Sequence, residues 1–493
     1  MNSNRASFRI SAATLLVLTA TAAVCAQSAA AQESEVLKRK VIDQVDSIEP
    51  VIEEMSIKLW DYAELALLET RSADLLVNVL DEAGFKIQTD VADMPTAFVA
   101  TYGAGSPVIG ILAEYDALPG VGNQVVPERK PRTDGITSGQ GCGHNLFGAA
   151  SVGAAIALKE LMETEDLKGT IKLFGTPAEE TVVGKVYMAK AGVFDGLDAV
   201  LEWHPGETNE VRNQAGRAMN SFEVEFFGQA AHGSADPWNG RSALDAVEMM
   251  NYGVNMMREH VKPTARIHYV IPHAGDAPNV VPEYAKVWYY VRDINRTEVS
   301  KYYNRILKIA AGAALATETT HKVHLITGVY EYLLNRPLQE ALQKNLELVG
   351  APQFTEAEQE FARSLQRITG KEEKGFNDKI KSLPDEPGEV KGGSTDVADV
   401  SWIVPTAGFR VATAAEDVPW HSWATTACSG TRAGRKGAVV AAKVIAATGV
   451  DLLTQPTLVE EAKAFFLKAT DGKPYEPPIP ADQKPPTIEA ANQ

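Results

Sequence analysis

The chain has 493 residues, about three times the length of a typical domain, so two or more domains are expected. Hydrophobic residues make up 45% of it and charged residues 23%, which excludes a wholly disordered or fibrous protein. The formal charge is −17, from 47 basic and 64 acidic residues, which argues against a non-specific nucleic-acid binder because such proteins carry a basic surface.

Residues 1–31 have the three parts of an export signal. Arg5 and Arg9 precede an apolar run from about Ala12 to Ala26, and the alanines at 29–31 offer an Ala-x-Ala cleavage site. The run is shorter than the roughly 20 residues of a membrane-spanning helix, which favours cleavage over a transmembrane anchor. We expect an exported, periplasmic protein that has no membrane segment after cleavage.

Residues 32–220 have the pattern of an α/β domain. Apolar spacing indicates helical structure over 33–83, which Gly84 ends, and a helix of small residues over 145–162. Short apolar runs indicate strands at 85–91, 97–102, 108–113, 170–175 and 199–203. Strands that alternate with helices predict a mixed, mostly parallel sheet sandwiched by helices.

Residues 221–329 change to the order strand, helix, strand, strand, helix, strand. The strands are expected at 221–228, 265–272, 283–292 and 322–329, and the helices at 242–260 and 297–320. This order is that of the split, ferredoxin-like α+β unit. We interpret it as a second domain inserted into the α/β core.

The α/β core is expected to resume over 330–455. It contains a strand at 403–411 and a helix of small residues at 437–448. Residues 351–391 are charged and interrupted by proline and glycine, so we interpret them as a surface insertion. Residues 456–493 are expected to form a C-terminal helix and an extended, proline-rich tail.

Four clusters of chemically active side chains lie at predicted strand ends or just before a helix. They are Glu114-Tyr115-Asp116, Cys142-Gly143-His144, Glu179-Glu180 and Trp203-His204-Pro205, and His421 adds a late imidazole. The carboxyl ends of strands form the ligand crevice of an open α/β sheet. Imidazole and thiolate suit zinc, and carboxylates also admit manganese or cobalt.

Each cluster alone also has a purely structural explanation. An acidic pair usually lies on a solvated face, a lone histidine is usually structural, and a buried cysteine is usually a small hydrophobe. Glu179 and Glu180 would face opposite sides of a strand, but at a bend both can face one crevice. The occurrence of all the clusters at strand ends favours a divalent-metal site.

The clusters, in this order, resemble the co-catalytic metallopeptidase and aminoacylase family that includes carboxypeptidase G, and within it the amidohydrolase branch. The motifs that carry the resemblance are AEYDALPG (113–120), GCGHN (141–145), GTPAEE (175–180), EWHPG (202–206), AHGSADPWNGRSALDAV (231–247), GDAPNVVPE (275–283), GGSTDVADVSW (392–402) and HSW (421–423). They cover most of the chain from about residue 34 to 455. The resemblance implies a zinc-exopeptidase-like catalytic domain in two parts, 32–220 and 330–455, with a lid and dimerisation domain over 221–329.

The resemblance also implies individual roles. Glu179 is expected to be the general base, His232 to reach the substrate in a neighbouring subunit, and Asn279 to lie near bound substrate. The implied metal ligands are Cys142, His144, Glu180, His204 and His421. The wider family has His-x-Asp where this chain has Glu114-Tyr115-Asp116, so Asp116 is expected to orient a ligand and Glu114 has no assigned role. The implied cofactors are two divalent ions per subunit, zinc or manganese, with cobalt also admitted.

The implied activity is metal-dependent hydrolysis of the amide bond of N-acyl amino acids, and the branch suggests an aromatic acyl-glutamate such as p-aminobenzoyl-glutamate. A general exported carboxypeptidase or aminoacylase is the alternative among enzymes. A catalytically dead periplasmic binding protein is an alternative of another class, and Glu179 counts against it because a binder needs no second acid beside Glu180. A scaffold that acts through residues 221–329 is a third. The expected partners are a small-molecule substrate and a second copy of the chain, and the resemblance also raises a separate partner subunit.

Overall fold

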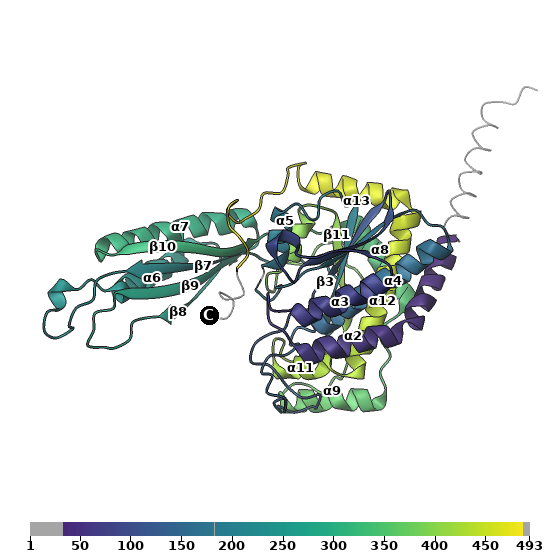
Figure 1. Cartoon of the computed structure of the whole chain (residues 1–493), viewed down its shortest axis with the longest axis horizontal. Helices are drawn as coiled ribbons and strands as arrows, with labels where there is room; N and C mark the ends of the chain where they lie inside the picture. Colours follow the sequence, from purple (N-terminus) through teal and green to yellow (C-terminus); the bar gives the residue numbers. More distant parts are fainter. Residues whose placement is uncertain (1–32, 182, 487–493) are drawn as a thin grey trace, which may run out of the picture.

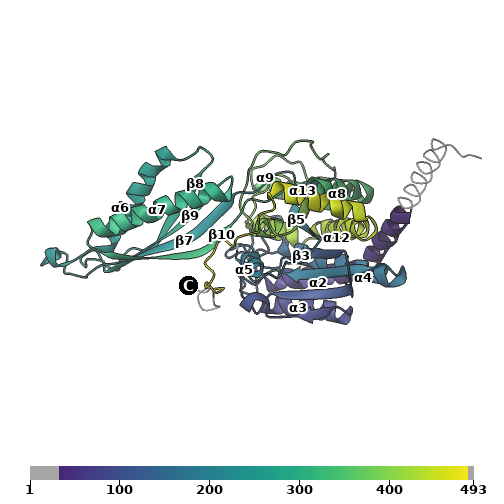
Figure 2. The same cartoon turned by 90° about the horizontal axis from the view of Figure 1, so that it is seen from above.

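A seven-stranded sheet covered by helices and a separate four-stranded sheet form the described part of the chain, residues 33–181 and 183–486, in this computed structural model (Figure 1). The predicted export signal lies outside the described residues, and so do residues 487–493 of the predicted tail. The two sheets have separate hydrophobic cores. They follow one another along the long axis of the molecule (Figures 1 and 2).

The large sheet is mixed, with its parallel strands in the centre. Its order is β1-β2-β4-β3-β5-β11-β6. The strands are β1 (Lys86–Gln88), β2 (Phe98–Ala104), β3 (Val108–Ala113), β4 (Gly169–Gly175), β5 (Ala199–Gly206), β6 (Glu210–Val211) and β11 (Thr406–Ala412). Neighbours among β4, β3, β5 and β11 are parallel, and the outer strands are antiparallel. The predicted mixed sheet is confirmed, but only its central strand pairs are parallel.

The helices of this body cover the sheet. They are α2 (Glu49–Tyr62), α3 (Thr70–Glu82), α4 (His144–Thr164), α5 (Gly184–Lys190), α8 (Arg336–Val349), α9 (Glu356–Ile368), α10 (Val397–Ser401), α11 (Trp423–Ser429), α12 (Arg432–Thr454) and α13 (Pro456–Ala469), with a short 3-10 turn at Val91–Asp93. α4 and α12 pack against each other and against the central strands. Among the described residues, only α12 is long and apolar enough to cross a membrane, and 78% of its apolar window is buried inside the fold. Such burial is what a core helix of this sheet requires.

The helical stretch predicted over 33–83 is interrupted twice. Residues 33–47 are helical, α2 begins a new helix with proline in its first turn, and α3 follows after a break at 63–69. Ala63 and Leu67 have left-handed backbone conformations, with φ of 44° and 63°, which a continuing helix cannot contain. Within the break, Leu65 forms an isolated bridge with Ala117, so the interruption ties this region to the end of β3.

The four-stranded unit has the predicted order of elements. It consists of β7 (Ala218–Phe227), α6 (Ala243–Met257), β8 (Arg266–His273), β9 (Tyr284–Asp293), α7 (Arg296–Ala316) and β10 (Thr320–Val329), with 3-10 turns at Pro237–Asn239 and Arg258–His260. The sheet order is β10-β7-β9-β8 and every pair is antiparallel. Burial alternates strictly along β9, because one face packs on the two helices. We call this body the four-stranded unit.

The chain after α13 returns to the junction between the two sheets. The Tyr475 hydroxyl donates to Asp399 at 2.7 Å. The side-chain amide of Gln483 donates to the carbonyls of Leu325 and Ile326 in β10, at 2.7 and 3.0 Å, and to the Tyr187 hydroxyl in α5 at 2.9 Å. Residues 470–486 therefore form a strap that joins the large body to the four-stranded unit.

Candidate metal centre

The clusters predicted from the sequence meet at one edge of the large sheet. Glu114 and Asp116 follow β3, Glu179 and Glu180 follow β4, and His204 lies in β5. Cys142 and His144 lie at the start of α4, and His421 lies in the loop before α11. This is the carboxyl edge of the parallel strands, where an open α/β sheet binds its ligands.

Local backbone geometry brings the distant segments together. Gly143 has a φ of 78°, and a Cβ there would lie 2.9 Å from the Cβ of Pro205, so only glycine lets the start of α4 approach β5. His421 also has a left-handed backbone, with a φ of 55°, and its N–H donates to the Gly141 carbonyl at 3.2 Å. These contacts place Cys142 between His204 and His421.

The bend after β4 turns two consecutive glutamates into one crevice. Ala178 has a φ of 59°, and its N–H donates to the buried carboxylate of Glu69 at 2.9 Å. The N–H of Glu180 donates to Asp116 Oδ2 at 2.9 Å. Held at both ends, Glu179 and Glu180 both line the same cavity.

Two groups of candidate metal ligands share the thiol of Cys142. One group is Cys142, His144 and His204, and the other is Cys142, Glu180 and His421; within each group all ligand atoms lie within 4.8 Å of one another. Cys142 Sγ is 3.5 Å from His204 Nε2, and His421 Nε2 is 3.6 Å from Glu180 Oε2. The arrangement suits two cations that share one thiolate.

The hydrogen bonds of two imidazoles, the buried His144 and the half-buried His204, turn their Nε2 atoms toward this centre. His144 Nδ1 lies 2.9 Å from Asp116 Oδ1, and a carboxylate can only accept, so Nδ1 carries the proton. His204 Nδ1 donates to the Pro205 carbonyl at 2.7 Å. Burial lowers the pKa of His204 well below its usual range, which keeps that ring neutral. Burial opposes a charge on His144, but the neighbouring Cys142 and Asp116 raise its pKa well above the usual range, so a metal ion at its Nε2 would take the place of a proton. The Nε2 atom of His204 is free to bind a cation.

Several polar atoms of the centre are buried without a hydrogen-bond partner. Among the described residues these include His144 Nε2, Glu114 Oε2 and Glu180 Oε1, whereas Glu114 Oε1 is paired with Lys185 at 2.7 Å. Burial also raises the pKa of the Cys142 thiol and raises that of Glu180 to about 7. A group of buried acceptors without donors is unfavourable in itself, and a divalent cation would satisfy all of them. The donor set therefore fits a metal centre.

Asp116 bridges two parts of the centre without belonging to either ligand group. One of its oxygens binds the His144 ring, the other binds the backbone of Glu180, and its side chain is fully buried. Such contacts fix the tautomer and the direction of a ligand.

His232 and Asn279 do not reach this centre within one chain. Both are exposed, and they lie in the loops after β7 and before β9, at the end of the four-stranded unit away from the large sheet (Figure 1). The two loops contact each other through a bridge between His232 and Val280. Neither residue lines the cavity that holds the candidate ligands.

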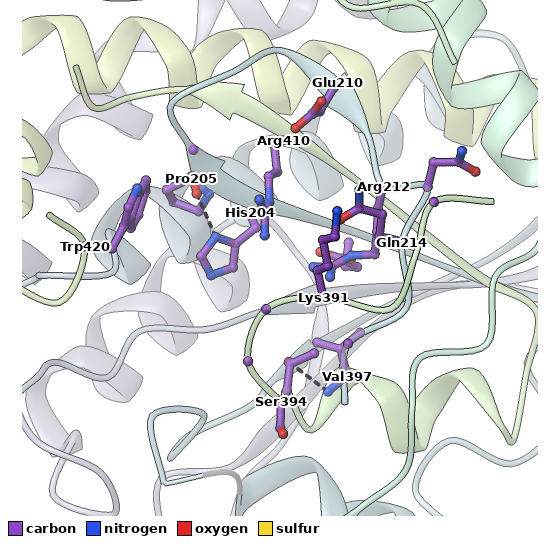
Figure 3. Close-up of a pocket in the computed structure, with 18 of the residues that line it drawn as sticks. His204, Pro205, Glu210, Arg212, Gln214, Lys391, Ser394, Val397, Arg410 and Trp420 are labelled. Atoms are coloured by element: carbon purple, nitrogen blue, oxygen red, sulfur yellow. Dashed lines mark hydrogen bonds and ion pairs between the residues drawn. The ribbon is translucent and has the colours of Figure 1, made fainter. Parts of the chain in front are cut away.

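The cavity beside the candidate ligands has a volume of about 790 Å³. Arginine and lysine side chains that belong to none of the sequence motifs also line it. Figure 3 shows Arg410 next to His204, with Trp420 on one side and Arg212 and Lys391 on the other. Arg292 enters the cavity from β9 of the four-stranded unit, and its Nε is buried without a hydrogen-bond partner. The only sequence signal for Arg292 was its place in an alternating strand, on the face opposite the apolar residues.

Comparisons with known proteins give the family. Residues 110–386 match Peptidase family M20/M25/M40. The chain is 36% identical over 472 residues to the B subunit of the p-aminobenzoyl-glutamate hydrolase of Escherichia coli (strain K12), covering 91% of this chain and 98% of that protein. It is 28% identical over 455 residues to the Xaa-Arg dipeptidase of Mus musculus, covering 89% and 94%.

A solved structure agrees with this fold. The Bacillus subtilis YXEP protein, described as a dinuclear metal binding peptidase from the M20 family, superposes with a TM-score of 0.56 at 19% identity, covering 83% of this chain and 99% of that chain. The family resemblance inferred from the motifs is confirmed: the chain belongs to peptidase family M20/M25/M40 and is a hydrolase.

Proposed function

We propose that this protein uses two divalent metal ions to hydrolyse the amide bond of N-acyl amino acids, and that its substrate is an aromatic acyl-glutamate such as p-aminobenzoyl-glutamate. The observation that carries the proposal is the pair of ligand groups that share Cys142, with a further carboxylate, Glu179, directly beside them. The name of the Escherichia coli relative, a p-aminobenzoyl-glutamate hydrolase, supports the substrate that the family branch suggested.

Glu179 is the proton carrier in this proposal. Its Oε2 lies 3.9 Å from His144 Nε2, and the residue is only 8% exposed. When bound, the metal pair supplies a water of lowered pKa and polarises the amide carbonyl. Glu179 takes the proton of the attacking water and gives it to the leaving amine. The partner subunit's His232 and Asn279 would face the substrate from the neighbouring chain, where a preorganised donor stabilises a developing oxyanion.

The charges of the cavity favour an acidic leaving amino acid over a basic one. Arg212 is paired with Glu202 at 3.0 Å, and Lys381 is paired with Glu210 at 3.1 Å. Arg292 and Arg410 line the same cavity, and in the described part of the chain neither forms an ion pair. Two unpaired guanidinium groups suit the two carboxylates of a glutamate product, because arginine binds carboxylates in bidentate geometry.

A substrate panel on the metal-loaded protein tests this assignment. We expect kcat/KM for p-aminobenzoyl-glutamate to exceed that for p-aminobenzoyl-glutamine by about 10- to 100-fold, because a charge-assisted hydrogen bond is worth about 1.5–3 kcal/mol. The arginine and alanine conjugates should be no better than the glutamine conjugate. Amino-acid release is the measurement.

The same panel separates the alternatives. Equal rates on all conjugates would indicate a general aminoacylase or carboxypeptidase, and metal-loaded protein with no turnover would indicate a binding protein. One of the two arginines is expected to bind the side-chain carboxylate of the glutamate. Replacing that arginine, by Arg292→Gln or by Arg410→Gln, should abolish the preference for glutamate over glutamine. A preference unchanged in both variants would contradict the proposed role of these arginines.

We also propose that the protein is a homodimer through the four-stranded unit. α6 exposes Met249, Tyr252 and Met256, at 45%, 66% and 58%, on one helical face, and β8, an edge strand, exposes Val270 and Ile271. Unpaired strand edges and contiguous apolar faces are surfaces that proteins cover. A second copy of the chain would cover both and could bring His232 to a neighbouring site.

Light scattering of the purified chain should give twice the chain mass. Tyr252→Glu combined with Met256→Glu should give a monomer that keeps its metal and loses most of its activity, because His232 then has no neighbouring site to reach. An active monomer at assay concentration would refute both the dimer and the role of His232. A monomer that becomes active only on addition of a second, different chain would show that a separate partner subunit takes this surface.

A further inference from the structure

Three charged side chains form a buried cluster behind the candidate metal centre. Lys185 Nζ lies 2.7 Å from Glu114 Oε1 and 2.7 Å from Asp396 Oδ1, and the Lys185 backbone N–H donates to Asp396 Oδ2 at 2.8 Å. None of the three is more than 1% exposed. They come from the end of β3, from α5 and from the start of α10, so the fold brings together residues that are far apart in sequence.

The cluster contacts the centre through the second oxygen of Glu114. Glu114 Oε2 lies 3.2 Å from His144 Nε2, the ring nitrogen that does not face Asp116. Neither atom has a hydrogen-bond partner. Two buried acceptors at this distance repel unless a proton or a cation lies between them.

The neighbouring ligand atoms favour a metal cation over a proton. Glu114, His144 and Glu179 form a third group in which all candidate ligand atoms lie within 4.8 Å, and His144 also belongs to the Cys142 group. A single proton on Nε2 would serve one acceptor, whereas a metal ion binds several donors at once. The unpartnered Nε2, fully buried, points to the same conclusion.

We propose that Glu114 is a further ligand of the metal centre, with Oε1 held by the buried Lys185–Asp396 pair and Oε2 directed to the ion that His144 binds. This inference rests on the metal centre of the proposed function. Lys185 acts as a positioning residue, because a buried carboxylate requires a compensating charge and this ammonium fixes one of its two oxygens. Glu114 thus acquires the role that the sequence could not assign.

Two neutral replacements of Glu114 test the assignment. Glu114→Gln and Glu114→His both remove the carboxylate charge and both leave Lys185 paired with Asp396, so the core cluster keeps an ion pair and the variants should fold. Only histidine can still bind a metal ion. We expect Glu114→Gln to bind Zn²⁺ or Co²⁺ at least about tenfold more weakly at one of its two positions, and Glu114→His to stay within a few-fold of the wild type.

The readouts are metal content by elemental analysis, affinity by chelator competition, and the absorption spectrum of the cobalt-loaded protein, which should change in Glu114→Gln. The matched control is Glu202→Gln, since Glu202 is also a buried carboxylate paired with a cation beside the same cavity but belongs to none of the ligand groups. Its metal affinity should not change. Thermal unfolding of the metal-free variants checks that each one is folded.

The outcomes separate this inference from the proposed function. Unchanged stoichiometry, affinity and cobalt spectrum in Glu114→Gln would overturn the ligand role of Glu114. Equal losses in Glu114→Gln and Glu114→His would also overturn it, because the effect would then follow charge and not ligation. A wild-type protein that binds no metal at all would instead refute the metal centre itself.

Discussion

Replacing Glu179 with glutamine is expected to lower kcat by about 10²–10⁴-fold while the protein keeps both metal ions. Glutamine has the size and polarity of glutamate but cannot take the proton of the attacking water. The loss corresponds to about 3–5 kcal/mol of transition-state stabilisation, at ~1.4 kcal/mol per factor of ten. Glu179 belongs to the third group, with Glu114 and His144, but to neither of the groups that share Cys142, so its replacement should leave the ligands of those two groups in place.

The neighbouring Glu180 provides the matched comparison. Glu180→Gln should lose the ion that His421 and Cys142 share with it, and activity should recover in part when metal is supplied in excess. Metal content and kcat measured on both variants distinguish a proton carrier from a ligand. A Glu179→Gln enzyme with near-normal kcat would remove the proposed mechanism. Near-normal behaviour of both variants would mean that the two carboxylates are a merely structural pair.

Replacing Cys142 with serine is expected to have the broadest effect, because its thiol is the one atom common to the two ligand groups. Metal affinity should fall at both positions, by more than the 10–100-fold typical of losing a partner that only supports a ligand. Activity should fall to background. The measurements are metal content after dialysis and amino-acid release at saturating metal.

The other described cysteine serves as the control. Cys142 and Cys428 are both free and buried, and Cys428 packs in a small core cluster with alanines and Val418. Cys428→Ala should therefore keep both ions and leave activity within a few-fold. Active, metal-loaded protein in which mass mapping finds a Cys142–Cys428 disulfide would contradict the thiolate assignment.

Much of the fold was predictable because periodicity and residue size carried the information. The alternating strands and the two helices of small residues, α4 and α12, followed from patterns that local physics imposes. The break between α2 and α3 was not predictable, since alanine and leucine are good helix formers and no local signal marks Ala63 or Leu67 as left-handed. Tertiary contact with the end of β3 decides that conformation.

The candidate site was also predictable only in part. Cys142, His144, Glu180, His204 and His421 stood in short motifs, and the structure brings those motifs together. The Glu114–Lys185–Asp396 cluster was missed because its members are 71 and 211 positions apart, and no spacing rule connects them. One signal existed: Lys185 stands in a small-residue and apolar stretch, and a lysine that is fully buried requires partners. The resemblance suggested which residues could bind metal, but only the packing shows which buried groups contact them.

The strap formed by residues 470–486 has a consequence for how the molecule is completed during synthesis. Gln483 joins Leu325 in β10 to Tyr187 in α5. It is synthesised 158 residues after the first and 296 residues after the second. By then each sheet has its whole sequence and its own core, and such bodies fold as separate units. The hydrogen bonds of Gln483 between the two bodies therefore form last. A chain that ends early or is cleaved in the tail would keep both cores but lose the Gln483 hydrogen bonds between the two bodies.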